Sequence, residues 1–329
     1  MLVTYERDIL LVENPVSTNA PLNRGVIDAF KASEWGSACI EEPTIGPDYD
    51  ENIDHLTTQI KSGMLVVSLG GDGQANIVGN AVITASEHGA EDVQFLAMPT
   101  GRTNDWSLSV YGEDMIKKRS FLRYLGDEAQ ALPFTTIEVE KEYEGRSTIR
   151  HAQAYYSAGA SAAIAATYGS RSYREGRYRH KLPNLVRDGS TMLSSFIEDE
   201  AFKCARDGET LEVHELAWTT IERLALVMRW AIDSRAPTVI GAEYPKRFFP
   251  LSVLGRAATR GIHKGIMRTG LQGEPLEEPA EFTVLPDERQ RRKPLRDQFD
   301  GEASVLAAGT KISVKPHHAA FVTRILKTV

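Results

Sequence analysis

The residues best suited to chemistry stand in one glycine-rich stretch, residues 66–82, with the sequence VVSLGGDGQANIVGNAV. An apolar run typical of a buried strand is followed at once by Gly70, Gly71 and Gly73. Glycines permit a tight turn, and their missing side chains let backbone N–H groups approach phosphate oxygens. A helix that begins near Gln74 would direct its positive N-terminal end at the same place. The stretch therefore predicts a phosphate-binding turn.

Asp72 lies inside this turn and brings a negative charge close to the expected phosphate. Two like charges repel, so direct contact is unfavourable. A divalent cation that bridges the carboxylate and the phosphates removes the conflict, and Mg²⁺ is the usual choice. The alternative is a structural turn between strand and helix, with Asp72 as a cap. On these residues alone, both interpretations stay open.

Two further polar loops follow apolar runs. The segment MPTGRTNDW contains Gly101, Asn104 and Asp105, and the segment ENPVSTN contains Asn14 and Ser17. The first loop could bind a nucleotide, although Asp105 could equally cap a helix. If the three loops meet at one edge of a sheet, they form a stronger argument for a site than any one of them.

The elements that must position these loops follow from the spacing of apolar residues. We expect buried strands at Ile9–Val12, Met64–Leu69 and Val93–Met98, with helices at Pro21–Glu34, Asn52–Lys61 and Gln74–His88. Alternating strands and helices predict a parallel α/β sheet with right-handed crossovers. Ligands of such sheets bind at the carboxyl ends of the strands, where these loops emerge.

The pattern changes near residue 131. Alternating apolar residues then indicate half-exposed strands, as at Ile137 and Val139, Phe282 and Val284, and Ile312 and Val314. We also expect a long amphipathic helix from Leu211 to Ile232. The predicted organisation is an α/β nucleotide-binding domain, residues 1–131, and a mostly antiparallel β substrate domain with helical insertions, residues 132–329. The extreme C-terminus is expected to pack back on the first domain.

Composition narrows the function classes. The 329 residues are 42% hydrophobic and 25% charged, which excludes collagen-like, coiled-coil and wholly disordered chains. The net charge of −7 argues against a general nucleic-acid coat protein. Two cysteines cannot form a disulfide framework. With no 18-residue apolar stretch and no secretion signal, we expect a cytoplasmic protein without a membrane span.

Basic charge is nevertheless concentrated in two segments, Arg171–Arg187 and Arg289–Arg296. They are either solvated loops or surfaces that contact phosphates or an anionic membrane, where each basic side chain contributes ~1 kcal/mol. Both interpretations of the two segments stay open, solvated loops or peripheral contact with an anionic membrane surface, and we expect no nucleic-acid partner.

The order of the motifs resembles the diacylglycerol kinase catalytic family, which includes bacterial lipid kinases and sphingosine kinases. The matching segments are Asn14-Pro15-Val16-Ser17, Gly70-Gly71-Asp72-Gly73-Gln74, Pro99-Thr100-Gly101-Arg102-Thr103-Asn104-Asp105 and Asp300-Gly301-Glu302. GGDG alone also resembles NAD kinases, whereas the ND loop and the late DGE favour lipid kinases.

The resemblance implies ATP and Mg²⁺ bound in a cleft between the two domains, and a lipid substrate with a free hydroxyl such as diacylglycerol. It implies that Gly70–Gly73 bind the ATP phosphates, with Asp72 at the metal. It places Asn14, Ser17, Gly101, Thr103 and Asn104 on the nucleotide side. Gln74 stands at the end of the glycine-rich turn, residues 70–74, which we call the phosphate loop. Asp300 would be the general base that accepts the proton of the lipid hydroxyl, supported by Glu302. Taken alone, Asp300-Gly301 is more typical of a hairpin turn.

Four positions depart from the family pattern. Gln74 replaces threonine, Ile77 replaces glutamate, Arg102 replaces threonine, and Ser161 stands where aspartate is usual. A lost polar group weakens nucleotide or metal binding by ~1–3 kcal/mol if nothing substitutes for it, and Arg102 could offset this with a charged contact to phosphate. Two alternatives to a lipid kinase follow: a non-catalytic nucleotide or lipid sensor, and an NAD kinase-type metabolite kinase.

Overall fold

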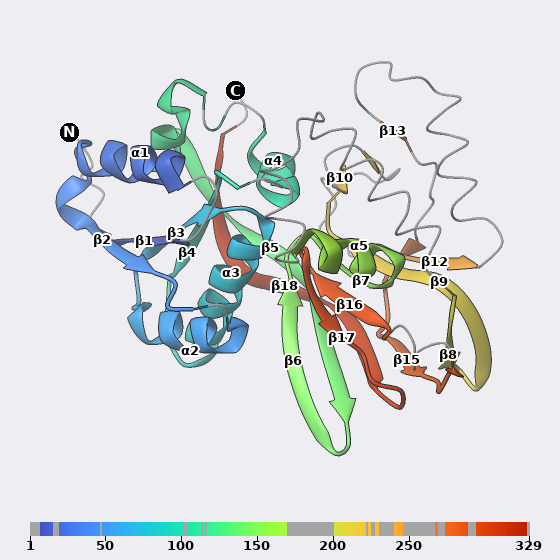
Figure 1. Cartoon of the computed structure of the whole chain (residues 1–329). Coiled ribbons are helices and arrows are strands. Elements are labelled where there is room, and N and C mark those ends of the chain that lie inside the picture. The colour runs from blue at the N-terminus through green and yellow to red at the C-terminus, as the bar shows by residue number, and fades with distance from the viewer. Residues whose placement is uncertain are drawn as a thin grey trace. The chain divides into compact units, whose positions relative to one another are not determined.

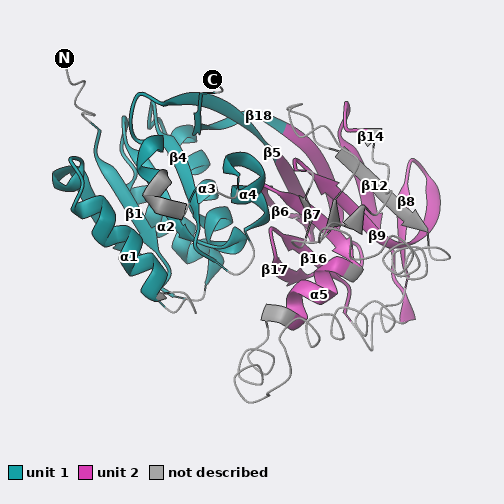
Figure 2. Ribbon diagram, turned by 90° about the horizontal axis from the view of Figure 1, so that it is seen from above, with its two compact units in different colours: residues 1–136, 317–329 teal, residues 137–316 magenta. Residues whose placement is uncertain are grey.

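The computed structural model describes residues 7–15, 20–46, 48–101, 104–112, 115, 117–169, 201–221, 223–224, 228–229, 240–245, 267–268, 274–288 and 294–327. The chain forms two compact units (Figure 2). Unit 1 comprises residues 1–136 and 317–329, and unit 2 comprises residues 137–316. Strand β5 (Ala129–Tyr143) and strand β18 (Lys311–Leu326) each run from one unit into the other.

Unit 1 is built from alternating strands and helices before β5 begins. In chain order these are β1 (Ile9–Glu13), α1 (Ala20–Lys31), η1 (Gly36–Ala38), β2 (Cys39–Pro43), α2 (Tyr49–Gln59), β3 (Leu65–Gly70), α3 (Asp72–Glu87), β4 (Gln94–Pro99), α4 (Asp105–Tyr111) and η2 (Lys117–Tyr124). The three predicted strands and three predicted helices are all present, within a few residues of the expected bounds.

The sheet of unit 1 is parallel, in the order β18-β4-β3-β1-β2. Strands β1, β3 and β4 are buried on both faces, which explains their unbroken apolar sequences. Helix α1 covers one face, and α2 and α3 cover the other (Figure 1). The predicted α/β fold class is confirmed. Strand β2 was not predicted, because it is a half-exposed edge strand.

Unit 2 is mostly antiparallel. After β5 come β6 (Arg146–Ala152), β7 (Tyr155–Gly159), α5 (Ala160–Gly169), β8 (Phe202–Arg206), β9 (Glu209–Thr219), β10 (Arg223–Leu224), β11 (Met228–Arg229), β12 (Ile240–Pro245), β13 (Met267–Arg268), β14 (Glu274–Pro275), β15 (Ala280–Val284), β16 (Arg296–Phe299) and β17 (Glu302–Val305). Its main sheet runs β17-β16-β7-β9-β8-β15-β18.

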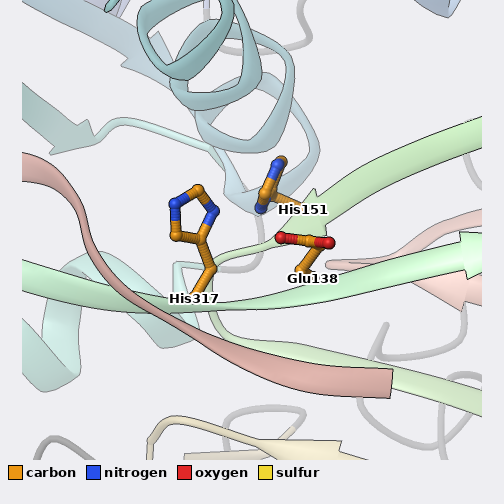
Figure 3. A group of neighbouring side chains, drawn as sticks. All are labelled: Glu138, His151 and His317. Carbon is orange, nitrogen blue, oxygen red and sulfur yellow. The ribbon is translucent and has the colours of Figure 1, made fainter. Parts of the chain in front are cut away.

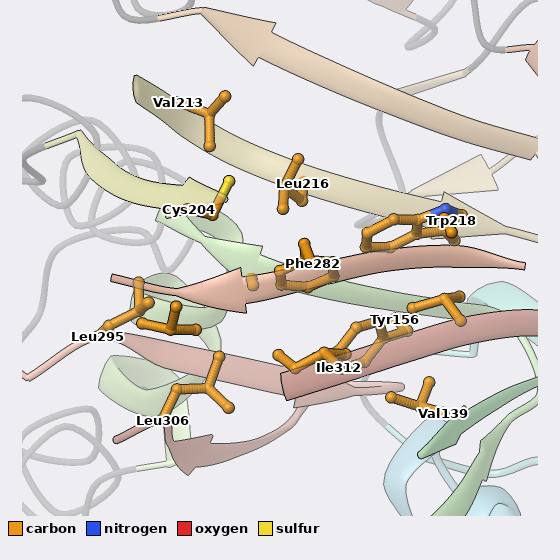
Figure 4. Close-up of a cluster of buried hydrophobic side chains, with 14 of the residues drawn as sticks. Val139, Tyr156, Cys204, Val213, Leu216, Trp218, Phe282, Leu295, Leu306 and Ile312 are labelled. Carbon is orange, nitrogen blue, oxygen red and sulfur yellow. The ribbon is translucent and has the colours of Figure 1, made fainter. Parts of the chain in front are cut away.

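One apolar core holds unit 2 together (Figure 4). Trp218 stacks on Phe282 with ring centroids 5.7 Å apart, and Tyr156 packs against Phe299 at 4.8 Å. These aromatic side chains come from β9, β15, β7 and β16, so the core joins strands that are distant in sequence. Aromatic pairs of this kind stabilise a core beyond the burial of their area.

The prediction of a helix from Leu211 to Ile232 is wrong. Residues 209–219 form strand β9, which pairs with β7, β8 and β12. Because β9 is central and its residues 213–219 are buried on both faces, its apolar residues do not alternate, and their spacing resembles that of a helix. Residues 222, 225–227 and 230–232 lie outside the described residues. None of the described helices is long and apolar enough to cross a membrane.

Candidate active site

The glycine-rich turn lies at the carboxyl end of β3, where the chain enters α3. Gly71 is the N-cap residue of α3, and no side chain caps this helix end. The first intrahelical bond runs from the Ala75 N–H to the Gly71 carbonyl, at 2.9 Å. The 16-residue helix α3 thus directs its N-terminal N–H groups and the positive end of its dipole at the turn. This is the arrangement that binds phosphate groups.

Asp72 joins this turn to the next loop. Its Oδ2 accepts the backbone N–H of Asp105 at 2.9 Å, and its Oδ1 accepts that of Trp106 at 3.1 Å. The side chain is 2% exposed. Asp72 therefore caps α4, a helix 33 residues further along the chain, and not α3, the helix that begins at its own turn. Asp105 does not cap α4, whose N-cap residue is Asn104.

The loop after β4 packs against the glycine-rich turn, backbone to backbone. The Gly101 N–H donates to the Gly70 carbonyl at 2.9 Å. A Cβ atom on Gly101 would lie 2.0 Å from the Gly71 Cα, so only glycine fits at this position. Asn104 closes the loop, since its Oδ1 accepts the Gly101 N–H and its Nδ2 donates to the Gly101 carbonyl. Gly70, Gly71, Gly101 and Asn104 thus lie together at the carboxyl ends of β3 and β4.

Two buried amide side chains lie at the same strand end. Gln74, 7% exposed, folds over Gly70, and neither its Nε2 nor its Oε1 has a hydrogen-bond partner. Asn23 of α1 donates to the Leu69 carbonyl at 3.4 Å, and its Oδ1 has no partner. Sequence reasoning missed Asn23. The available signal was a polar residue on the buried face of an amphipathic helix.

In unit 2, Asp300 and Gly301 form the two-residue turn between β16 and β17. Phe299 pairs with Glu302 across it, and the φ angles of Asp300 and Gly301 are 49° and 92°. Two consecutive positive φ angles are typical of a type I′ hairpin, which Asp-Gly favours. The hairpin interpretation of this motif is therefore confirmed as local structure.

The Asp300 side chain also clamps the turn between β6 and β7. Its Oδ2 accepts the N–H of Gln153 at 2.7 Å, and its Oδ1 accepts those of Ala154 and Tyr155, each at 2.8 Å. The residue is 2% exposed, whereas Glu302 is exposed at the start of β17. The carboxylate orientation of Asp300 is thus fixed by three backbone groups.

Ser161, one of the departures from the family pattern, lies at the start of α5. Its N–H donates to Glu215 Oε2 at 2.9 Å, and its hydroxyl donates to Glu215 Oε1. Gln298 Nε2 reaches both the Ser157 and the Ser161 hydroxyl at 2.9 Å. A carboxylate therefore does lie at this helix N-terminus, where negative charge is stabilising. It is contributed by Glu215 of β9 instead of residue 161.

Comparison with solved structures identifies the architecture. A diacylglycerol kinase from Bacillus anthracis str. Sterne superposes with a TM-score of 0.56 at 13% identity, over 96% of each chain. Another structure from that bacterium gives a TM-score of 0.57 at 14% identity, again over 96% of each chain. Yeast NADH kinase complexed with NADH gives 0.53 at 12% identity, covering 98% of this chain and 84% of the other.

The chain has the diacylglycerol kinase and NADH kinase fold. No family model and no curated protein matches the sequence. The predicted likeness to lipid kinases is thus supported at the level of the kinase fold.

Within this kinase fold, some predicted residues lie outside the description. Ser17, Arg102 and Thr103 are among them, as are the whole first basic segment, residues 171–187, and residues 289–293 of the second. Asn14 directly follows β1 and is half-buried.

Glu138 and His151, two side chains of metal-binding type, point toward one another from β5 and β6 (Figure 3). Lys315 Nζ lies 2.8 Å from Glu138 Oε1, and this carboxylate raises the pKa of Lys315. His317, also drawn in Figure 3, belongs to unit 1. Within unit 2 the pair offers two protein ligands, one fewer than a catalytic zinc site uses.

Proposed function

We propose that the protein is a lipid kinase that transfers the γ-phosphate of ATP, with Mg²⁺, to a hydroxyl of diacylglycerol or a related lipid. One observation carries the proposal. The glycine-rich turn and the Gly101–Asn104 loop pack backbone to backbone at the N-terminus of α3, in a fold shared with two kinds of kinase. Phosphoryl transfer requires little beyond such positioning and charge neutralisation.

The glycine-rich turn is the proposed binding site of the ATP phosphates. Gly71 and Gly73 are half-buried, and the N-cap residue has no side chain to occupy the end of α3. Asn14 and Asn104 would line the nucleotide side, together with Ser17 and Thr103, which are assigned from the sequence alone.

Asp72 is the proposed metal-binding residue. Because both of its oxygens accept backbone N–H groups, we propose that it acts on Mg²⁺ through a bound water, which this ion readily retains. The cation would neutralise charge on the transferring phosphate. Asp72 itself would hold the two loops in register.

Asp300 is the proposed general base, with Glu302 in support. The three N–H groups that bind Asp300 fix the direction of its carboxylate, which a base must have before its substrate arrives. Glu302 lies two residues away and is exposed.

The direct test is transfer of labelled γ-phosphate from ATP with Mg²⁺ to a mixed-lipid extract. Label in an organic-soluble product supports a lipid kinase. Asp300→Asn and Glu302→Gln should then be compared, because these substitutions keep side-chain size while weakening a base. If both variants transfer phosphate at the wild-type rate, the assignment of the base is wrong.

A second candidate is a kinase of a soluble dinucleotide. The likeness to yeast NADH kinase favours it, since its TM-score is close to that of the diacylglycerol kinase. The same assay with NADH and NAD as acceptors separates the two candidates. Water-soluble labelled product without any labelled lipid would favour the dinucleotide.

A further inference from the structure

The buried side chain of Gln74 makes no hydrogen bond within the described part of the protein. Its position is the third residue of α3, counted from the N-cap Gly71. A glutamine at this position commonly reaches back and accepts the N-cap N–H, in the arrangement called a capping box. Here Gln74 Oε1 has no partner, so that bond is not made.

The side chain turns instead toward the phosphate loop. Its Cβ and Cγ lie 2.5 Å and 2.7 Å from the place where a Cβ on Gly70 would be. The residue is 7% exposed, and both polar atoms of its amide are buried without a hydrogen bond. A buried polar atom without a partner costs about 1–3 kcal/mol, so the folded protein carries this cost at the end of β3.

We propose that Gln74 is a specificity-determining residue of the nucleotide site, with an amide that binds the phosphate and cation together. Its Nε2 donates to a phosphate oxygen, and its Oε1 accepts from water bound to the cation. An amide suits this task because it offers donors and an acceptor on neighbouring atoms. The inference rests on the proposed function, since it requires a nucleotide at this loop.

Gln74 supplies an acceptor in addition to Asp72, whose two oxygens already accept backbone N–H groups. Both Asp72 oxygens are bonded to the start of α4, while Gln74 points at the loop with both ends available. The longer side chain that replaces threonine thus brings a neutral acceptor to the metal side of the phosphates. A ligand with phosphates but no cation would satisfy only the Nε2 donor of Gln74 and would leave its Oε1 acceptor without a partner.

The test compares stability and binding in Gln74→Met, which keeps the length of the side chain and removes its polar atoms. Without nucleotide, this variant should melt at the wild-type temperature or above it, because unpartnered polar atoms are removed. Its affinity for ADP with Mg²⁺, measured by calorimetry, should fall about 10- to 100-fold, the loss expected for a hydrogen bond to a charged group. Omitting Mg²⁺ should weaken the wild type more than the variant.

Gln59→Met is the matched control, since Gln59 lies at the end of α2 and donates to Thr58. It should leave ADP affinity unchanged. If Gln74→Met binds ADP as tightly as the wild type, or melts well below it without nucleotide, the inference is wrong while the proposed function stands. If the wild type binds neither ADP nor ATP with Mg²⁺, the proposed function and the inference fail together.

Discussion

The carboxylate of Asp72 accepts the backbone N–H of Asp105 at 2.9 Å, across 33 residues of sequence. This bond, with its companion to Trp106, makes the third residue of the GGDG motif the cap of another helix. The motif thus has two tasks. Its glycines shape the turn at the N-terminus of α3, and its aspartate sets the position of the neighbouring loop.

Asp72→Asn should destabilise unit 1. An asparagine can present an oxygen to only one of the two N–H groups, and its NH₂ group then faces the other. We expect a loss of about 2 kcal/mol, since a buried donor without an acceptor costs about 1–3 kcal/mol. Urea unfolding measures this loss in the free energy of unfolding. The control is Glu87→Gln, the same kind of substitution at an exposed position of α3. Weakened nucleotide binding with unchanged stability would instead make Asp72 a ligand and not a clamp.

Gly101→Ala should disrupt the contact between the two loops. The new Cβ would meet backbone atoms of Gly71 at 2.0–2.2 Å, and backbone cannot move aside as a flexible side chain can. We expect a lower melting temperature and loss of nucleotide binding. Gly46→Ala is the matched control, because a Cβ there meets nothing within 4 Å. Equal melting temperatures for the two variants would count against the close packing of these loops.

Asp300→Ala should unfold more readily than the wild type, by about 3 kcal/mol or more. Three buried N–H groups lose their acceptor, and alanine is strained at a positive φ. Loss of activity in this variant would therefore not identify a base. Asp300→Asn retains part of the clamp and tolerates the turn, so a stable but inactive Asp300→Asn protein is the informative result. Denaturant titration of both variants must accompany the activity assay.

We expect the buried Tyr156 to lower the free energy of unfolding at alkaline pH. Burial raises its pKa well above the usual value, and the nearby Asp297 carboxylate raises it further. The native phenol thus keeps its proton where the unfolded phenol, with a pKa of about 10, loses it. This contribution to stability is complete below pH ~10 and is lost as the pH rises above it.

The effect is measurable with Tyr156→Phe. The difference in urea midpoint between pH 8 and pH 11 should be smaller in this variant than in the wild type. Tyr111→Phe provides a comparison in unit 1, where burial also raises the tyrosine pKa. An unchanged difference in Tyr156→Phe would show that other groups control alkaline stability.

The sequence predicts the parts of this fold that local physics controls. Glycines at 70, 71 and 73 indicate a turn whatever surrounds it, and the double-sided burial of β3 appears directly as an apolar run. Asp-Gly at 300 and 301 likewise indicates the hairpin. These features need only neighbouring residues, so one sequence is enough to find them.

What the sequence could not supply is pairing between distant residues. Nothing near Asp72 indicates that its partner is the N-terminus of α4, and nothing near Ser161 points to Glu215, 54 residues away. Strand β9 was mistaken for a helix for the same reason. Its burial on both faces depends on three partner strands, and the spacing within residues 209–219 does not reveal them.

The C-terminal strand has a consequence for synthesis of the chain. In unit 1, the edge of β4 is covered by β18, through pairs such as Thr323 with Phe95, and the buried Arg324 ties that strand to the carbonyls that follow η2. A ribosome makes residues 7–124 long before residue 317 emerges. During that interval the parallel sheet would have an exposed, apolar edge at β4, which is the kind of surface that recruits strands from other chains. The order of synthesis thus makes the last residues of unit 1 its protection against aggregation.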